Sequence, residues 1–77
     1  MPTLEEFISI IKEYFQSAWR NLSTDQVDEY INGEEAQEVI THRYNEAAEE
    51  FKSGKITENI FKVGVASSVA NCLAYMY

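Results

Sequence analysis

Hydrophobic residues recur at intervals of three and four along the first part of the chain. The repeat consists of Leu4, Phe7, Ile8, Ile11, Phe15, Ala18 and Leu22. An α-helix turns about 100° per residue, so side chains at this spacing lie on one face. Ile10, Tyr14 and Trp19 widen the same face. We therefore predict an amphipathic helix over residues 3–20 whose apolar face is turned towards a core.

Three further segments carry helical patterns. Residues 34–52 have an apolar face that comprises Ala36, Val39, Ile40, Tyr44, Ala47, Ala48 and Phe51. Residues 24–31 form a shorter segment, which we expect to lie as a brace across the other helices. Residues 57–76 form the last helix. Because the connections are short, we expect sequential helices to be antiparallel neighbours.

Capping residues stand at three of the expected helix starts. Thr3 is followed three residues later by Glu6, and Ser23 is followed by Gln26, which is the spacing of a reciprocal capping box. Thr57 is a suitable N-cap residue for the last helix. The capping pattern therefore agrees with the starts that the hydrophobic periodicity indicates.

Glycine residues mark two of the expected helix ends. Asn32 and Gly33 end the short helix, and Gly54 stands where a left-handed residue would close the following one. The 77 residues include only three glycines and one proline, which disfavours a turn-rich β fold. We predict an all-α fold, a compact four-helix bundle-like single domain over residues 1–77 with three longer helices and one short brace helix.

The segment at residues 63–77 carries no charged side chain. A helix that crosses a membrane needs about 20 apolar residues. This run is shorter, is preceded by Lys62, and is interrupted by Ser67, Ser68 and Asn71. We therefore expect the segment to be part of a folded domain and not a membrane span.

The final helix has a wide apolar arc. Its small and polar residues fall on one narrow stripe, which we expect to face solvent and which contains Gly64, Ser67, Ser68, Asn71 and Tyr75. The other ~220° of the circumference, against ~100° in an ordinary surface helix, carries Phe61, Val63, Val65, Ala66, Val69, Ala70, Cys72, Leu73, Ala74, Met76 and Tyr77. Two arrangements would cover this arc. The helix is the centre of the bundle, or one side of it faces another copy or a partner, which Ala66, Ala70 and Ala74 would allow to approach closely.

Charge and cysteine content limit the class of partner. The net charge of −7 argues against direct binding to nucleic acid or adsorption to anionic membranes, and it permits binding to a basic protein surface. Cys72 is the only cysteine, so a disulfide framework is excluded, and we expect its thiol to be packed. The opening MPTLEEF lacks the features of a signal peptide. We expect a cytoplasmic protein, typical in size and composition of the accessory proteins of bacteria or mobile elements.

An acidic stretch lies between Arg20 and Arg43, where no other Lys or Arg occurs. It contains Asp25, Asp28, Glu29, Glu34, Glu35 and Glu38, with Tyr30 and Tyr44 beside them. One interpretation is structural, because carboxylates are favoured in the first turns of helices and on solvated faces. The other is functional: the acidic surface imitates a phosphate backbone and occupies the nucleic-acid-binding groove of a basic protein.

Residues suited to catalysis or metal binding are few. His42, the only histidine, has Glu38 and Glu46 four residues away on either side, a spacing that lets the side chains meet. These three are weak candidates for a metal site, because an exposed histidine between glutamates is more often only a charge neighbour. Arg43 is expected to reach Glu50 or a neighbouring helix. No phosphate loop, zinc spacing or nucleophile motif occurs, so we expect no cofactor and no enzyme activity.

The function predicted from these patterns is that of a small acidic helical accessory or regulatory domain that binds protein. The expected partner is a second copy of the chain, in a homodimer. The expected interface consists of Ile10, Tyr14, Trp19, Ala66, Ala70, Leu73, Ala74 and Tyr77. The alternative is a nucleic-acid mimic that inhibits a basic protein through residues 25–38. A more distant alternative is a metal-binding domain that uses Glu38, His42 and Glu46.

Overall fold

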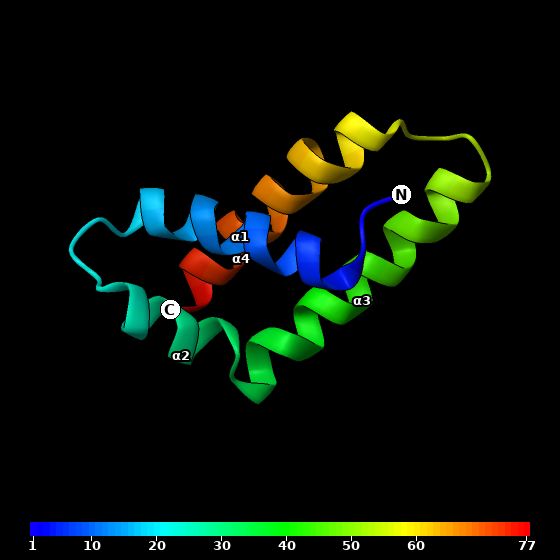
Figure 1. The fold of residues 1–77 in the computed structure, drawn as a ribbon. Helices are drawn as coiled ribbons and strands as arrows, with labels where there is room; N and C mark the ends of the chain where they lie inside the picture. Colours follow the sequence, from blue (N-terminus) through cyan, green and yellow to red (C-terminus); the bar gives the residue numbers. More distant parts are fainter.

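Four helices and no strand make up the structure, a computed structural model that describes residues 1–77 (Figure 1). They are α1 (Leu4–Ala18), α2 (Thr24–Ile31), α3 (Glu34–Lys52) and a final helix in which a π-helical segment η1 (Ile60–Val65) leads into α4 (Ala66–Met76). The predicted all-α, bundle-like fold is therefore confirmed, with α1 ending two residues early. None of the helices combines the length and the apolar composition that crossing a bilayer requires.

The three predicted N-caps are confirmed. The Thr3 hydroxyl accepts a hydrogen bond from the Glu6 N–H at 3.1 Å, and the Thr3 N–H donates to the Glu6 carboxylate at 3.2 Å. Ser23 and Gln26 make the same reciprocal pair at 3.1 and 2.8 Å. The Thr57 hydroxyl accepts from the N–H three residues further on at 3.1 Å. Each cap satisfies backbone donors that a helix start leaves without a partner.

The end of α3 is closed by the glycine that the sequence indicated. Gly54 has φ +80°, a conformation that glycine adopts without a steric cost. Its N–H donates to the Phe51 carbonyl at 3.1 Å, and the Lys55 N–H donates to the Glu50 carbonyl at 2.9 Å. This pair of bonds is a Schellman motif, which ends the helix and turns the chain towards the final helix.

A bend at Asn32 and Gly33 joins α2 to α3, and both helices run in the same general direction (Figure 1). The expectation that all sequential helices are antiparallel neighbours is therefore wrong at this connection. The Gly33 N–H donates to the Tyr30 carbonyl at 3.1 Å, and a Cβ atom on Gly33 would lie 3.1 Å from the same oxygen. The absence of a side chain lets α3 begin directly beside the end of α2.

The core lies mainly between α1 and the final helix, which run in the same direction. Phe7 meets Phe61 near the start of both helices, with ring centroids 5.6 Å apart, and Phe15 meets Tyr77 near their ends at 5.8 Å. The core is entirely apolar and comprises Phe7, Ile11, Phe15, Val27, Ile31, Ala36, Ile40, Ala47, Ala48, Phe61, Ala66, Val69, Ala70 and Leu73. The final helix supplies five of these residues, so part of its apolar arc is covered by α1 and α3 of the same chain, without all three other helices surrounding it.

The other side of the final helix is open to solvent. The predicted polar stripe is confirmed, since Ser67 is half-buried and the remaining members are exposed. Four residues that the sequence placed on the apolar arc are also exposed, namely Val63, Cys72, Met76 and Tyr77. The expectation that Cys72 is a packed thiol is therefore wrong, because α1 and α3 cover only part of the predicted arc.

Two clusters of aromatic side chains lie at the two ends of the interface between α1 and the final helix. The first aromatic cluster comprises Phe7, Tyr44, Phe51 and Phe61, with neighbouring ring centroids 5.4–6.3 Å apart. The second aromatic cluster comprises Phe15, Trp19, Tyr30 and Tyr77, with centroids 4.9–5.8 Å apart. Beside the first cluster, the N-terminal segment is fixed by the Tyr44 hydroxyl, which donates to the Pro2 carbonyl at 2.6 Å.

Candidate protein-binding site

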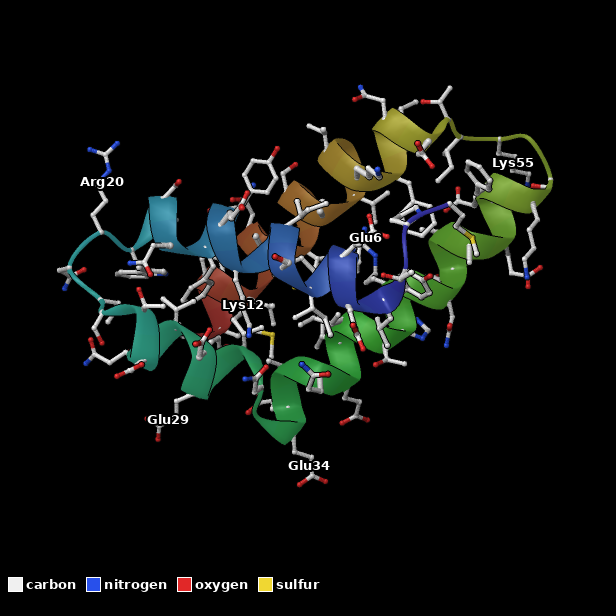
Figure 2. The ribbon with its side chains drawn as sticks, in the orientation of Figure 1. Glu6, Lys12, Arg20, Glu29, Glu34 and Lys55 are labelled. Carbon is white, nitrogen blue, oxygen red and sulfur yellow. The ribbon has the colours of Figure 1, made fainter.

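The acidic residues predicted from the sequence gather on α2 and the start of α3, where Glu29 and Glu34 project outwards in Figure 2. Asp28 is half-buried and forms an ion pair with Lys12 of α1, with Nζ 3.2 Å from Oδ1. The other members are exposed and form no ion pair: Asp25, Glu29, Glu34, Glu35 and Glu38. Five carboxylates in this region thus remain without a cation inside the molecule.

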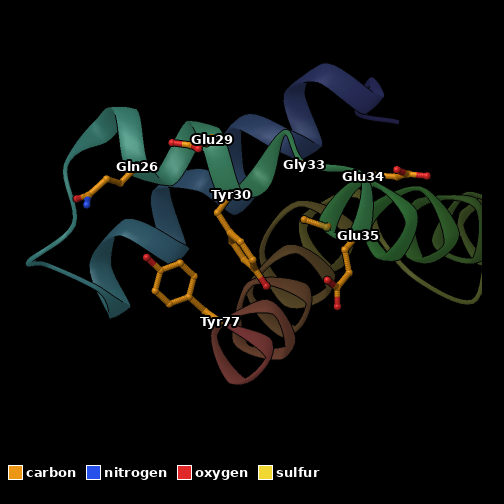
Figure 3. A pocket seen from close by; sticks show the side chains of 8 residues that line it. Gln26, Glu29, Tyr30, Gly33, Glu34, Glu35 and Tyr77 are labelled. Carbon is orange, nitrogen blue, oxygen red and sulfur yellow. The ribbon is translucent and has the colours of Figure 1, made fainter.

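A cleft of about 470 Å³ opens between this acidic surface and the end of α4 (Figure 3). We call it the acidic cleft. It is lined by Gln26, Glu29, Tyr30, Gly33, Glu34, Glu35, Ala36 and Tyr77. The rings of Tyr30 and Tyr77 meet edge to face, with centroids 4.9 Å apart and planes at 88°. The cleft therefore combines two aromatic walls with three carboxylates from its rim.

Tyr30 is the fixed wall of the acidic cleft. Its hydroxyl donates to the Leu73 carbonyl at 3.1 Å, which ties α2 to α4. Burial raises the pKa of Tyr30 above its usual value of 10.0, and the negative charge of Glu35 raises this pKa further. Figure 3 shows Glu35 on the side of the cleft that the Tyr30 hydroxyl faces. The negative charge of the cleft therefore comes from its glutamates.

The helix dipoles account for only part of this charge. Glu34 and Glu35 lie in the first turn of α3, where the macrodipole favours carboxylates. Glu29 lies in the last turns of α2, where no basic residue is present and the macrodipole disfavours a negative charge. The helix dipole therefore accounts for Glu34 and Glu35, whereas Glu29 fits the structural interpretation only as an exposed residue on a solvated face.

The sequence identified only some of the residues of this cleft. The glutamates and Tyr30 could be named from the sequence, whereas Gly33 and Tyr77 could not. Tyr77 is 47 residues from Tyr30 in the chain, and only the tertiary fold brings the two rings together. The expectation that Tyr44 borders the acidic surface is wrong, because its side chain belongs to the first aromatic cluster.

A second hollow also borders Tyr77 and is separate from the acidic cleft. This groove of about 550 Å³, which we call the aromatic groove, is lined by Trp19, Asn71, Ala74, Tyr75 and Tyr77 and contains no charged residue. Tyr75 is 94% exposed. The indole N–H of Trp19 is buried and has no hydrogen-bond acceptor.

The structure divides the predicted dimer interface into two groups. Ala66, Ala70 and Leu73 are buried against other parts of the same chain, so their assignment to an interface must be corrected. The small side chains do permit a close approach, but within the core of one chain. The remaining members keep exposed surface: Ile10, Tyr14, Trp19, Ala74 and Tyr77.

The weak metal candidates are not assembled into a site. Glu38, His42 and Glu46 do not form a group of three ligands. His42 Nε2 lies 3.7 Å from Glu46 Oε1, and Arg43 Nε lies 3.7 Å from the same oxygen. The sequence had suggested that Arg43 reaches Glu50 or a neighbouring helix; in the structure it contacts Glu46. A carboxylate that already faces a guanidinium is a poor ligand for a cation.

The chain matches no protein-family model, and comparisons with curated proteins and with solved structures give no significant match.

Proposed function

We propose that this chain is a protein-interaction domain without a catalytic step, and that it binds a basic segment of a partner protein at the acidic cleft. The observation that carries the proposal is the composition of this cleft: two tyrosine rings beside three glutamates that no cation of the chain neutralises. The single exposed thiol, Cys72, suits a reducing compartment, so we place the interaction in the cytoplasm.

An arginine or lysine side chain fits the chemistry of the acidic cleft. Tyr77 is 53% exposed as a residue, and its ring lines the cleft, where a guanidinium can stack on it. Glu35 lines the same cleft as the two rings, so a cation seated against the rings would also face a carboxylate. Glu29 and Glu34 at the rim would pair with neighbouring basic residues. The net charge of −7 would speed the approach of a basic partner.

A basic nucleic-acid-binding protein is one partner class that this surface suits. The unpaired carboxylates lie on α2 and the first turns of α3, and three of them, Glu29, Glu34 and Glu35, line one cleft. Such a surface competes with a phosphate backbone for a basic groove by charge alone. In that case the domain would act as an inhibitor of its partner.

The test uses a fluorescent peptide of alternating arginine and glycine, titrated with the protein at low and at high salt. We expect binding that weakens with salt. Replacing Glu29, Glu34 and Glu35 together by Gln should lower the affinity at least about tenfold, since three charge contacts are lost. The matched control replaces Glu13, Glu49 and Glu50 by Gln, which changes the net charge equally at exposed positions outside the cleft.

The two triple variants separate a site from general attraction. The proposal requires the control variant to bind the peptide within about threefold of the unmodified protein. Equal losses in both variants would show that only the overall charge attracts the peptide. Displacement of DNA from a basic DNA-binding protein by the unmodified chain, and not by the Glu29, Glu34 and Glu35 variant, would identify the inhibitor form of this function.

Self-association is a second candidate function, and the aromatic groove is the observation that favours it. Two copies with a net charge of −7 repel one another. The aromatic groove is a surface where they could meet without bringing charged side chains of the same sign together. Tyr75 is almost fully exposed, and an aromatic side chain can bury roughly 150–250 Å² in a contact.

Sedimentation equilibrium over a wide concentration range tests this candidate. A dimer that Tyr75→Ser dissociates would support it. The control is Ile60→Ser, which removes an exposed apolar side chain outside the groove. A monomer at all concentrations, or a dimer that both variants weaken equally, would remove the aromatic groove from consideration.

A further inference from the structure

The final helix changes its geometry part of the way along. Residues of η1 (Ile60–Val65) form π-helical hydrogen bonds, and α4 (Ala66–Met76) continues as an α-helix. A π turn contains more residues than an α turn, and such segments are rare. Both parts of the helix pack against the same core, because Phe61 in η1 and Ala66 in α4 are each fully buried.

A continuous α-helix would not bury both of these residues. At about 100° per residue, Phe61 would lie about 140° around the helix from Ala66 and would face solvent. Val63 would lie about 60° from Ala66 and would be covered. The observed exposures are the reverse, since Phe61 is 0% exposed and Val63 is 45% exposed.

The π geometry accounts for these exposures. A π turn advances each residue by only about 80°, which leaves Phe61 about 40° from Ala66 and moves Val63 to about 120° from it. The first position is on the covered side and the second is on the open side. The π-helical segment therefore rotates the start of the final helix so that Phe61 joins the first aromatic cluster.

We propose that the final helix contains one residue more than an α-helix can accommodate between Phe61 and Ala66, and that η1 absorbs this surplus residue. Gly64 has the position of the surplus residue. It is exposed, and a Cβ atom there would meet only the Ile60 side chain at an ordinary 3.6 Å. Its carbonyl accepts a hydrogen bond from the Ser67 hydroxyl at 3.1 Å, next to the junction of the two helix types.

The proposal makes a geometric prediction for a shorter chain. With Gly64 removed, a plain α-helix places Phe61 about 40° from Ala66, nearly where η1 now places it. In this shorter chain Val63 stays on the open side. Deleting Val63 and keeping Gly64 therefore gives the same helix register. Deleting one residue from η1 should therefore leave the core intact, whereas a deletion in an ordinary α-helix rotates one half of that helix away from the core.

The experiment compares three single deletions by thermal unfolding. Deleting Gly64 and deleting Val63 should each change the melting temperature by no more than about 5 °C. The control deletes Thr41, an exposed residue in the middle of α3, and should abolish the cooperative transition or lower its midpoint by more than about 15 °C. If the two η1 deletions are as damaging as the control, no surplus residue exists.

Thiol labelling tests the register in a chain of full length. In a Cys72→Ser background, Val63→Cys should react with a thiol reagent nearly as fast in the folded as in the unfolded protein. The corresponding control is Val69→Cys, at a position that is 0% exposed and should be protected. Protection of the thiol at position 63 would show that the helix is in the continuous α register and would overturn the proposal, whatever the deletions do.

Discussion

The two aromatic clusters lie at opposite ends of α1 and are built from similar parts, yet only one of them is closed. Each has a tyrosine whose hydroxyl donates to a distant backbone carbonyl, Tyr44 to Pro2 and Tyr30 to Leu73. In the first cluster two phenylalanine rings are fully buried. In the second cluster Tyr77 is 53% exposed and lines both the acidic cleft and the aromatic groove.

The difference follows from which elements cover each cluster. The first cluster is enclosed by α1, α3, η1 and the N-terminal segment, so its rings act as core. The second cluster lies between the end of α1, the short α2 and the residue that follows α4. Aromatic surface that is only partly covered stabilises the fold less and remains available for binding. We therefore expect the first cluster to determine stability and the second to provide the binding surface.

The largest expected effect is that of Phe61→Ala. The ring is fully buried and contacts three other rings of the first cluster, so truncation leaves a cavity. We expect a loss of about 3–5 kcal/mol in the free energy of unfolding, measured by urea titration. A loss below about 1 kcal/mol would mean that this end of the core is not closed.

Tyr77→Ala should lower the stability less than Phe61→Ala does, and it should weaken binding at the acidic cleft. Tyr77 is 53% exposed and contacts three rings of the second cluster. We therefore expect its removal to lower the free energy of unfolding by about 1–2 kcal/mol, measured by the same titration. Affinity for the arginine-glycine peptide should fall in parallel. A loss of stability as large as that of Phe61→Ala would contradict the distinction between the two clusters.

The two tyrosine hydroxyls provide a finer comparison. Tyr44→Phe and Tyr30→Phe each remove one hydrogen bond to a backbone carbonyl, which should cost about 0.5–1.5 kcal/mol. We expect Tyr44→Phe to cost more, because its bond is shorter and Pro2 is buried. Urea titrations of both variants measure the difference, and the reverse order would show that the second cluster is the more constrained one.

The smallest expected effect is the pH dependence that Tyr30 introduces. Burial and Glu35 raise the pKa of Tyr30 above 10.0, so the folded state retains the phenol proton more strongly than the unfolded state does. The resulting stability is fully present below pH 10 and is lost as the pH rises through the folded-state pKa. Unfolding titrations from neutral to strongly alkaline pH should show a decline that is weaker in Tyr30→Phe. An identical decline in the variant would contradict this assignment.

The sequence by itself determined the helices and most of their ends. The capping boxes at Thr3 and Ser23, the Thr57 cap and the left-handed Gly54 were all predicted and are all present. These features depend on groups within a few residues of one another, so the local sequence contains all the information they require. The acidic surface was also visible, because charge is a property of composition.

Only the tertiary structure decided which neighbour each apolar face has. Ala66, Ala70 and Leu73 could equally have met another chain, and the position of α1 determines that they are core residues. The burial of Phe61 in place of Val63 depends on a π-helical segment that a period of 3.6 residues does not reveal. The meeting of Tyr30 with Tyr77 joins residues far apart in the chain. In each case packing between distant segments outweighs the local pattern, and no short stretch of sequence contains both partners.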